Sequence, residues 1–234
     1  MNKTKNVIIL CFSILLISGF CYGDDWPQFR GPNRDGKSTE TGLLKKWPAS
    51  GPKKLWSVEG LGIGFSSVAI SRGLVYTTGM IDGEGFLFAY DIEGNLKWKE
   101  SYGPEWTRSY KGTRTTPTVD GKRVYVFSGT GNMVCFEART GEKVWQVDTL
   151  TKFEGKNIRW GMSGSPLIDG RKVYCTPGGK KGSMVALDKM TGRTIWATSG
   201  LDELSAYSSP ILIERGGNRL LINMIQKSVI CVNA

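Results

Sequence analysis

The chain has 234 residues and a formal net charge of +10, and it contains no histidine. Without histidine it cannot form a Ser-His-Asp triad, an H-E-x-x-H zinc site or a C-x-x-C-H haem attachment site. The length allows one or two domains, and the scattered basic residues indicate a solvated surface. Nucleic acid is therefore not an expected partner, whereas affinity for anionic lipid or polysaccharide stays open.

Residues 1–23 have the pattern of a secretory signal peptide. Lys3 and Lys5 precede the uncharged run Val7–Phe20, and the small residues that follow allow cleavage after Gly23. The uncharged run is shorter than the roughly 20 residues that span a bilayer. We therefore expect a secreted or periplasmic protein with no transmembrane segment after cleavage.

Three cysteines remain after that cleavage, and each stands in an apolar run: Cys135, Cys175 and Cys231. An odd and scattered set does not make a disulfide framework. The pattern predicts buried small side chains, and a reactive or metal-bound thiol is the alternative.

Residues 24–60 read as an N-terminal segment that ends in a leading strand. We expect Trp26 and Trp47 to anchor this segment to the domain that follows. Trp56, in KKLWSVEG, resembles the last residue of a repeat unit.

Residues 61–234 contain an internal repeat. It appears as FAYDIEGNLKW (88–98), CFEARTGEKVW (135–145) and ALDKMTGRTIW (186–196). In each copy an acidic residue precedes a turn, and a tryptophan follows the turn glycine at the fourth position. The shared residues are Asp91, Glu137 and Asp188; Gly94, Gly141 and Gly192; and Trp98, Trp145 and Trp196.

Each repeat unit reads as four short strands, because apolar residues alternate and Asp-Gly turns stand at 120–121 and 169–170. No segment keeps a helical period. Four-stranded units of about 40–50 residues are typical of a β-propeller, an all-β fold. The expected blades are residues 64–101, 114–148 and 163–199, with a truncated one at 207–234.

The repeated residues have a structural interpretation. An acid before a tight turn accepts backbone N–H groups, and glycine supplies the left-handed conformation. Strand alternation turns the tryptophan toward the neighbouring blade, where a large indole buries much surface. We assign this docking role to the three repeated tryptophans and to Trp56, with ligand stacking as the alternative.

The A-x-D-x-x-T-G-x-x-x-W pattern, with S-P or T-P before it, resembles the pyrroloquinoline-quinone-like (PQQ-like) propeller repeat. The stretch DWPQFRGPNRDG (25–36) also looks like the opening of many secreted bacterial members. The resemblance implies that the tryptophan docks one blade on the next. One branch of this group is the quinoprotein alcohol dehydrogenases, which hold the quinone and a calcium ion on the propeller axis. Another is the non-enzymatic propeller of the outer-membrane barrel assembly machinery.

The chain departs from the dehydrogenase pattern. It has no adjacent Cys-Cys pair and no haem motif, and the calcium-binding and catalytic carboxylates have no matching positions. The sequence therefore favours a non-catalytic scaffold or binding module without a cofactor, whose partner is an envelope protein or an extracellular ligand. A quinone- and calcium-dependent dehydrogenase with its active site partly outside this chain is the alternative. A carbohydrate-binding module attached to a degradative enzyme is the third hypothesis.

The last four residues, CVNA (231–234), begin another copy of the repeat, with Asn233 in the place of the acid. Propellers close with four to eight blades. We therefore expect a piece of a longer gene product that folds into an open arc with an exposed edge strand.

Two further tryptophans, Trp106 and Trp160, stand outside the docking register and precede the first strand of a blade. That strand lines the central channel of a propeller. Arg114 and Arg159 lie close to them in sequence. An aromatic ring beside a guanidinium would suit a planar or anionic ligand, and ordinary loop packing is the alternative.

Overall fold

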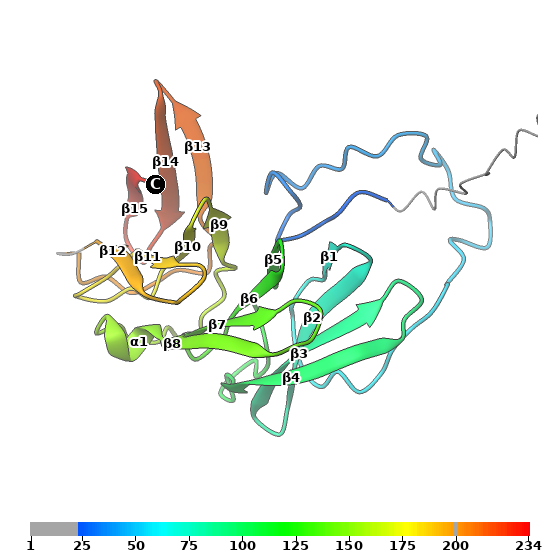
Figure 1. Ribbon diagram of the computed structural model, residues 1–234, viewed down its shortest axis with the longest axis horizontal. Helices are drawn as coiled ribbons and strands as arrows, with labels where there is room; N and C mark the ends of the chain where they lie inside the picture. The colour runs from blue at the N-terminus through cyan, green and yellow to red at the C-terminus, as the bar shows by residue number, and fades with distance from the viewer. Residues whose placement is uncertain (1–22, 199–200) are drawn as a thin grey trace, which may run out of the picture.

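The computed structural model describes residues 23–198 and 201–234, so the predicted signal peptide lies outside the described residues except for Gly23. Four antiparallel sheets follow one another around an arc and form part of a propeller (Figure 1). This arrangement confirms the predicted all-β fold. The one helix in the described part is α1 (Thr149–Lys152).

The first sheet contains β1 (Ala69–Ser71), β2 (Leu74–Ile81), β3 (Glu84–Asp91) and β4 (Leu96–Pro104). The second contains β5 (Thr118–Asp120), β6 (Arg123–Phe127), β7 (Asn132–Glu137) and β8 (Lys143–Asp148). The third contains β9 (Leu167–Asp169), β10 (Lys172–Cys175), β11 (Val185–Asp188) and β12 (Thr194–Ala197). The fourth contains β13 (Ile211–Arg215), β14 (Asn218–Met224) and β15 (Val229–Asn233). Strands are neighbours in chain order within every sheet, as in propeller blades.

The outer strands show why the repeat places its tryptophan where it does. In β8 the side chain of Trp145 is buried while its neighbours Val144 and Gln146 are exposed. The same bulge interrupts the pairing of the third and fourth strands in three blades, just before the turn of the repeat. A bulge re-aims the side chains beyond it, so each outer strand turns its tryptophan toward the next blade.

The core lies between consecutive sheets. One cluster joins the first and second sheets, with Tyr76, Trp98 and Phe136 among its members. A second cluster joins the second and third sheets, and another joins the third and fourth. Because the second sheet is covered on both faces, its central strands are apolar almost throughout, whereas the strands of the fourth sheet are largely exposed.

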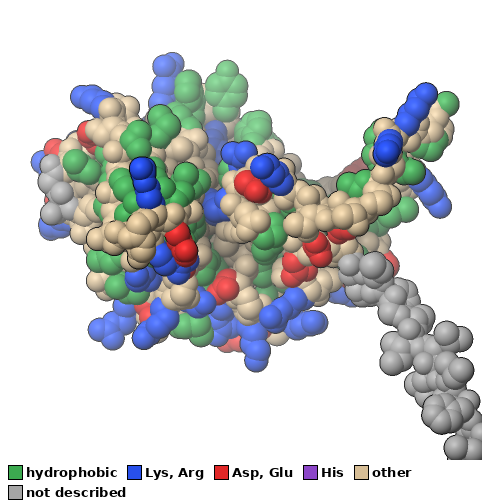
Figure 2. Space-filling view, turned by 90° about the horizontal axis from the view of Figure 1, so that it is seen from above, with side chains coloured by type: hydrophobic (Ala, Val, Ile, Leu, Met, Phe, Trp, Pro, Cys, Tyr) green, Lys and Arg blue, Asp and Glu red, His purple; other side chains and the backbone are tan. Residues whose placement is uncertain are grey.

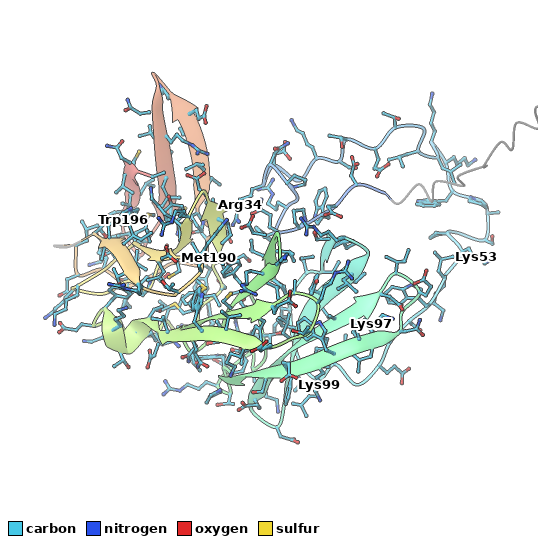
Figure 3. All side chains as sticks on the ribbon, viewed as in Figure 1. Arg34, Lys53, Lys97, Lys99, Met190 and Trp196 are labelled. Carbon is cyan, nitrogen blue, oxygen red and sulfur yellow. The ribbon has the colours of Figure 1, made fainter. Side chains whose placement is uncertain are left out.

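The N-terminal segment lies along the inner strands. Trp26 pairs with Ile70 of β1, and the amide of Val119 in β5 donates to the carbonyl of Pro27 at 2.7 Å. The buried guanidinium of Arg34 reaches toward β9 (Figure 3) and donates to the carbonyl of Pro166 at 2.9 Å. The segment is therefore fixed to three blades by residues near its start.

Two expectations about individual side chains are wrong. The side chain of Trp47 is 61% exposed and anchors nothing, because its stretch of chain crosses the surface. Cys135 and Cys175 are buried, but Cys231 is exposed. Cys231 lies on the edge strand β15, where the neighbouring Ile230 takes the buried face.

No helix in the described ranges combines the length and the hydrophobicity that a membrane crossing requires.

Candidate functional site

The repeated tryptophans form blade junctions with a common geometry. In three of the four, the indole nitrogen donates to a backbone carbonyl of the next blade, that of the residue after the turn acid. The pairs are Trp56 with Ile92 at 2.7 Å, Trp98 with Ala138 at 3.0 Å and Trp145 with Lys189 at 3.0 Å. Trp196 is partly buried beside Tyr174, with ring centroids 5.8 Å apart, in the cluster between the third and fourth sheets.

The turn glycine lies directly under the indole of the preceding blade. A Cβ atom on Gly141 would stand 2.8 Å from the ring of Trp98, and the φ angle of this glycine is +78°. Gly94 and Gly192 meet the rings of Trp56 and Trp145 in the same way. Both the close approach and the left-handed backbone therefore require glycine at this position.

The acid before each turn holds the turn closed. Asp91 accepts from the amides of two residues in its turn, and Glu137 and Asp188 do the same. Burial alone would raise the pKa of Glu137, but hydrogen bonds from Thr140 and Arg139 outweigh it and lower the pKa. These residues are occupied in holding the scaffold together.

A different region carries a candidate binding site. Near the starts of the inner strands, six residues line an open hollow with a volume of about 540 Å³. We call it the rim hollow, and its residues are Phe65, Tyr110, Arg114, Trp160, Ser163 and Tyr207. This volume falls within the range of small-molecule sites.

Four of these residues occupy equivalent positions in the four blades. Each stands four residues before the first residue of the inner strands β1, β5, β9 and β13. The four are Phe65, Arg114, Ser163 and Tyr207. The fold thus presents one position per blade to the hollow, and the residue differs in every blade.

Hydroxyl residues two positions further on connect the blades. The amide of Thr116 donates to the hydroxyl of Ser165 at 3.0 Å. The amide of Ser165 donates to the hydroxyl of Ser209 at 2.9 Å. This chain of hydrogen bonds fixes the backbone beneath the hollow from one blade to the next.

Trp160 is the central aromatic residue of the hollow. Its ring lies 5.4 Å from that of Tyr207 and 6.4 Å from that of Tyr110, measured between centroids. The hydroxyl of Tyr207 accepts from the amide of Trp160 at 3.0 Å, which fixes the pair. The exposed fractions are 38% for Trp160, 48% for Tyr207, 62% for Phe65 and 72% for Tyr110.

Arg114 supplies the positive charge of the hollow. Its guanidinium donates to the carbonyls of Gly112 and Tyr110 and lies 5.8 Å from the ring centroid of Phe65. Burial lowers the pKa of Arg114, and the nearby Glu105 opposes that shift. An arginine has five N–H donors, so others remain for a ligand.

Glu105 is a structural residue that the sequence did not single out. Its buried carboxylate accepts from the amides of Trp106 and Gly129, both at 2.7 Å, and from the hydroxyl of Tyr102 at 2.9 Å. Burial raises its pKa, and these hydrogen bonds offset part of the shift. The sequence signal was an acid seven residues after the repeat tryptophan, which recurs as Glu203 after Trp196.

A second cavity of about 390 Å³ adjoins the rim hollow, because Arg114, Ser163 and Tyr207 line both. We call it the arginine cavity. Its other residues are Phe29, Arg30, Arg34, Ser165, Ser208, Ser209 and Ile211. Burial lowers the pKa of Arg34 to about 10, so its guanidinium stays charged at neutral pH. No Asp or Glu lines either cavity.

The four residues singled out beside the inner strands separate into two pairs. Arg114 and Trp160 meet in the rim hollow. Trp106 does not reach it, because its ring is buried against Gly161 and its indole nitrogen donates to the carbonyl of Ser109. Arg159 stacks on Trp160 at 5.3 Å but lines neither cavity.

The lining side chains do not fit the calcium ion that accompanies the quinone in the dehydrogenases. Calcium takes carboxylate and carbonyl oxygens as ligands, and the side chains of the two cavities offer guanidinium, hydroxyl and aromatic groups. In the described part of the chain, no group of three or more Cys, Asp or Glu residues is placed to hold a metal ion.

The basic side chains are spread over the face seen in Figure 2, with acidic side chains among them.

Known proteins match this chain over its repeats. The chain is 26% identical over 141 residues to the outer membrane protein assembly factor BamB of Kangiella koreensis, covering 58% of this chain and 32% of that protein. It is 30% identical over 136 residues to the quinohemoprotein alcohol dehydrogenase ADH-IIG of Pseudomonas putida, covering 53% and 18%. The chain thus spans a third or less of the length of these two relatives.

The fold also matches a solved structure. The crystal structure of BamB from Moraxella catarrhalis aligns with a TM-score of 0.55 and 22% identity, covering 76% of this chain and 49% of that one. The family model described as outer membrane protein assembly factor BamB matches residues 83–230, which is more than half of the chain. The protein therefore belongs to the PQQ-like β-propeller family of BamB, which is related to the quinoprotein alcohol dehydrogenases.

Proposed function

We propose that this protein is an exported, non-catalytic binding module in which a rigid propeller presents the rim hollow to a partner. The observation that carries the proposal is the composition of the hollow. One residue from each blade lines the hollow, and the lining side chains carry aromatic rings, a guanidinium and hydroxyl groups. Such groups bind and orient a ligand, whereas general acid–base chemistry needs a titratable group poised near the working pH.

The place of action follows from the N-terminal pattern. A positive start, an uncharged run and small residues before Asp24 are the features of an export signal. We accordingly place the mature protein in the periplasm or outside the cell, where an envelope protein or an extracellular ligand would meet it.

The scaffold role has support from the family. Its model is described as an outer membrane protein assembly factor, and the BamB of Kangiella koreensis carries the same description. In this chain the tryptophans and glycines of the repeat hold neighbouring blades together, and its acids hold the turns closed. Function is left to the loops and the rim, as is usual for a shared fold.

A quinone-dependent alcohol dehydrogenase is the second candidate. The 30% identity to the quinohemoprotein alcohol dehydrogenase favours it. The donor set of the two cavities does not favour it, because no carboxylate lines them.

One experiment separates the two candidates. The purified protein is incubated with the quinone and calcium and assayed for dye-linked oxidation of primary alcohols and for a change in quinone absorbance. The binding module predicts neither signal. It also predicts that the protein captures a specific ligand or envelope protein, and that Trp160→Ala weakens this capture. Alcohol turnover would overturn the proposal.

A further inference from the structure

The rim hollow and the arginine cavity together have a chemical character that the proposed function leaves unspecified. One side is aromatic and the other is basic, and Arg114, Ser163 and Tyr207 belong to both. A ligand that spans them meets exposed rings at one end and guanidinium groups with serine hydroxyls at the other. We propose that this double cavity binds an anionic oligosaccharide, a ligand class that rests on the proposed binding function.

The aromatic half suits a sugar ring. Trp160, Tyr207 and Tyr110 lie at different angles, with interplanar angles of 38° and 84° to the tryptophan. They form an uneven wall and not a flat slot, so a thin planar molecule would contact one ring only. The C–H face of a pyranose stacks on an indole, while its hydroxyls reach past the ring edges. Aromatic side chains with a polar tip are suited to such mixed surfaces.

The basic half sets the charge of the ligand. Arg30, Arg34 and Arg114 line it, and no acidic residue lines either cavity. Arg34 is held by Gln28, Ser165 and Pro166, so its charge is fixed in place. A guanidinium pairs best with a planar or multidentate oxyanion. Carboxylate and sulfate groups on a saccharide both satisfy this requirement.

An unpaired hydroxyl lies where the two halves meet. The oxygen of Ser163 is buried and has no hydrogen-bond partner among the described residues. A buried polar atom without a partner costs free energy, and a sugar hydroxyl would supply one. The hydrogen-bonded residues Ser165 and Ser209 keep the backbone beneath it rigid, so the site is formed before the ligand arrives.

The test is a titration of the purified protein by calorimetry. The probes are trigalacturonate, its uncharged methyl ester and a sulfated galactan tetrasaccharide. We expect saturable binding of at least one anionic probe. If the ligand is a uronate, the methyl ester should bind at least tenfold more weakly than trigalacturonate. The anionic probe should bind more weakly at 500 mM than at 50 mM NaCl. Binding of the sulfated probe alone assigns the site to sulfated glycans.

Two variants and a matched control locate the site. We expect Trp160→Ala to weaken binding of the anionic probe at least tenfold and to remove the ligand-induced change in tryptophan fluorescence. Arg114→Gln should weaken binding of the anionic probe and reduce its preference over an uncharged sugar, with Arg30 and Arg34 keeping the remainder. Trp56→Ala is the control, because Trp56 is 37% exposed, close to the 38% of Trp160, and lies outside both cavities. Thermal unfolding checks that each variant is folded.

The outcomes separate this inference from the proposed function. Failure of every saccharide to bind the wild-type protein, or equal binding by a folded Trp160→Ala variant, overturns the oligosaccharide site. If Trp160-dependent capture of an envelope protein is then observed, the binding module stands with a different ligand. Quinone-dependent alcohol oxidation would instead overturn the proposed function itself.

Discussion

The blade junctions and the rim hollow are built by the same repeat but obey opposite rules. At the junctions the first three blades repeat tryptophan and glycine, because every copy must fill the same space against its neighbour. At the rim the equivalent positions hold Phe65, Arg114, Ser163 and Tyr207, four different kinds of side chain. Within one chain, uniformity thus marks packing, and variety at a repeated position marks a surface free to take up a function.

The contrast is sharpest two residues further along the chain, just before the same inner strands begin. There the four blades carry Ser67, Thr116, Ser165 and Ser209, all hydroxyl residues. Two of them accept a hydrogen bond from the preceding blade. Uniform and varied positions therefore alternate beside the inner strands, one serving the scaffold and the other facing the hollow.

The largest expected effect is on a junction. Trp98 is buried, packs on Gly141 and Phe136, and donates a hydrogen bond to the next blade. We expect Trp98→Ala to lower the free energy of unfolding by about 3–5 kcal/mol, the usual cost of deleting a buried aromatic ring. Urea denaturation measures it.

Alanine variants of two partly exposed tryptophans test whether the cost depends on burial at a junction. Trp56 makes the same hydrogen bond but is 37% exposed, so Trp56→Ala should cost less than half as much as Trp98→Ala. Trp160→Ala at the rim should cost less than about 1 kcal/mol, as for a surface substitution. An equal loss for Trp98→Ala and Trp160→Ala would abolish the distinction between junction and rim.

The next effect separates packing from backbone strain. Gly141→Ala places a methyl group 2.8 Å from the Trp98 ring at a φ of +78°. We expect a loss of about 2–4 kcal/mol from left-handed strain together with overpacking. Gly121 is the matched control, because its φ is +59° and nothing lies within 4 Å of its added methyl. Gly121→Ala should cost about 1–2 kcal/mol, from the backbone term alone.

Arg34 belongs both to the arginine cavity and to the contacts that hold the scaffold together. It lines the arginine cavity but is buried and donates to Ser165 and Pro166. Arg34→Met would leave those carbonyls without their donor, so we expect a loss of about 1–3 kcal/mol. Proteolysis within residues 37–60 should also become faster as the N-terminal segment detaches. Arg30→Met is the control, since the Arg30 guanidinium donates only within its own turn, to the carbonyl of Asp35. Unchanged proteolysis in Arg34→Met would show that other contacts hold the segment.

The same contrast explains what the sequence could predict. The junctions recur with identical residues, so three copies of the repeat identified the blades, their order and the docking role of the tryptophans. The rim has no recurring residue type, and its lining comes from positions as far apart as Phe65 and Tyr207. Arg114 and Trp160 were found because an arginine and a tryptophan stood outside the repeat, and Phe65, Tyr110 and Tyr207 gave no such signal.

Trp106 shows why position before an inner strand is not enough. It stands in the loop before β5, but Gly161 of the following loop leaves a space that its ring fills, and Glu105 fixes its backbone. Such a fit depends on a glycine 55 residues away in the chain, between 106 and 161. Sequence patterns within one repeat contain no information about it.

The smallest expected effect is the pH dependence of stability, where the turn acid Glu137 and the buried Glu105 act with opposite sign. Hydrogen bonds lower the pKa of Glu137 in the folded protein, so its contribution is present above its unfolded pKa of about 4.3 and is lost as the pH falls below it. Burial raises the pKa of Glu105 in the folded protein above that of the unfolded chain. The folded state therefore takes up the proton first, and the protein gains stability as the pH falls from neutral toward the unfolded pKa of about 4.3. This gain is lost again as the pH rises.

Glutamine variants separate these two contributions, because glutamine keeps an acceptor oxygen and does not titrate. Measured by urea denaturation from pH 7 to pH 3, Glu137→Gln should lose less stability in acid than the wild type. Glu105→Gln should lack the gain between neutral pH and about pH 4.3, and its stability should therefore fall more steeply on acidification. If both variants changed the slope in the same direction, the carboxylate of Glu105 would be held in its charged form by its hydrogen bonds, as a turn acid is, and burial would not decide its pKa.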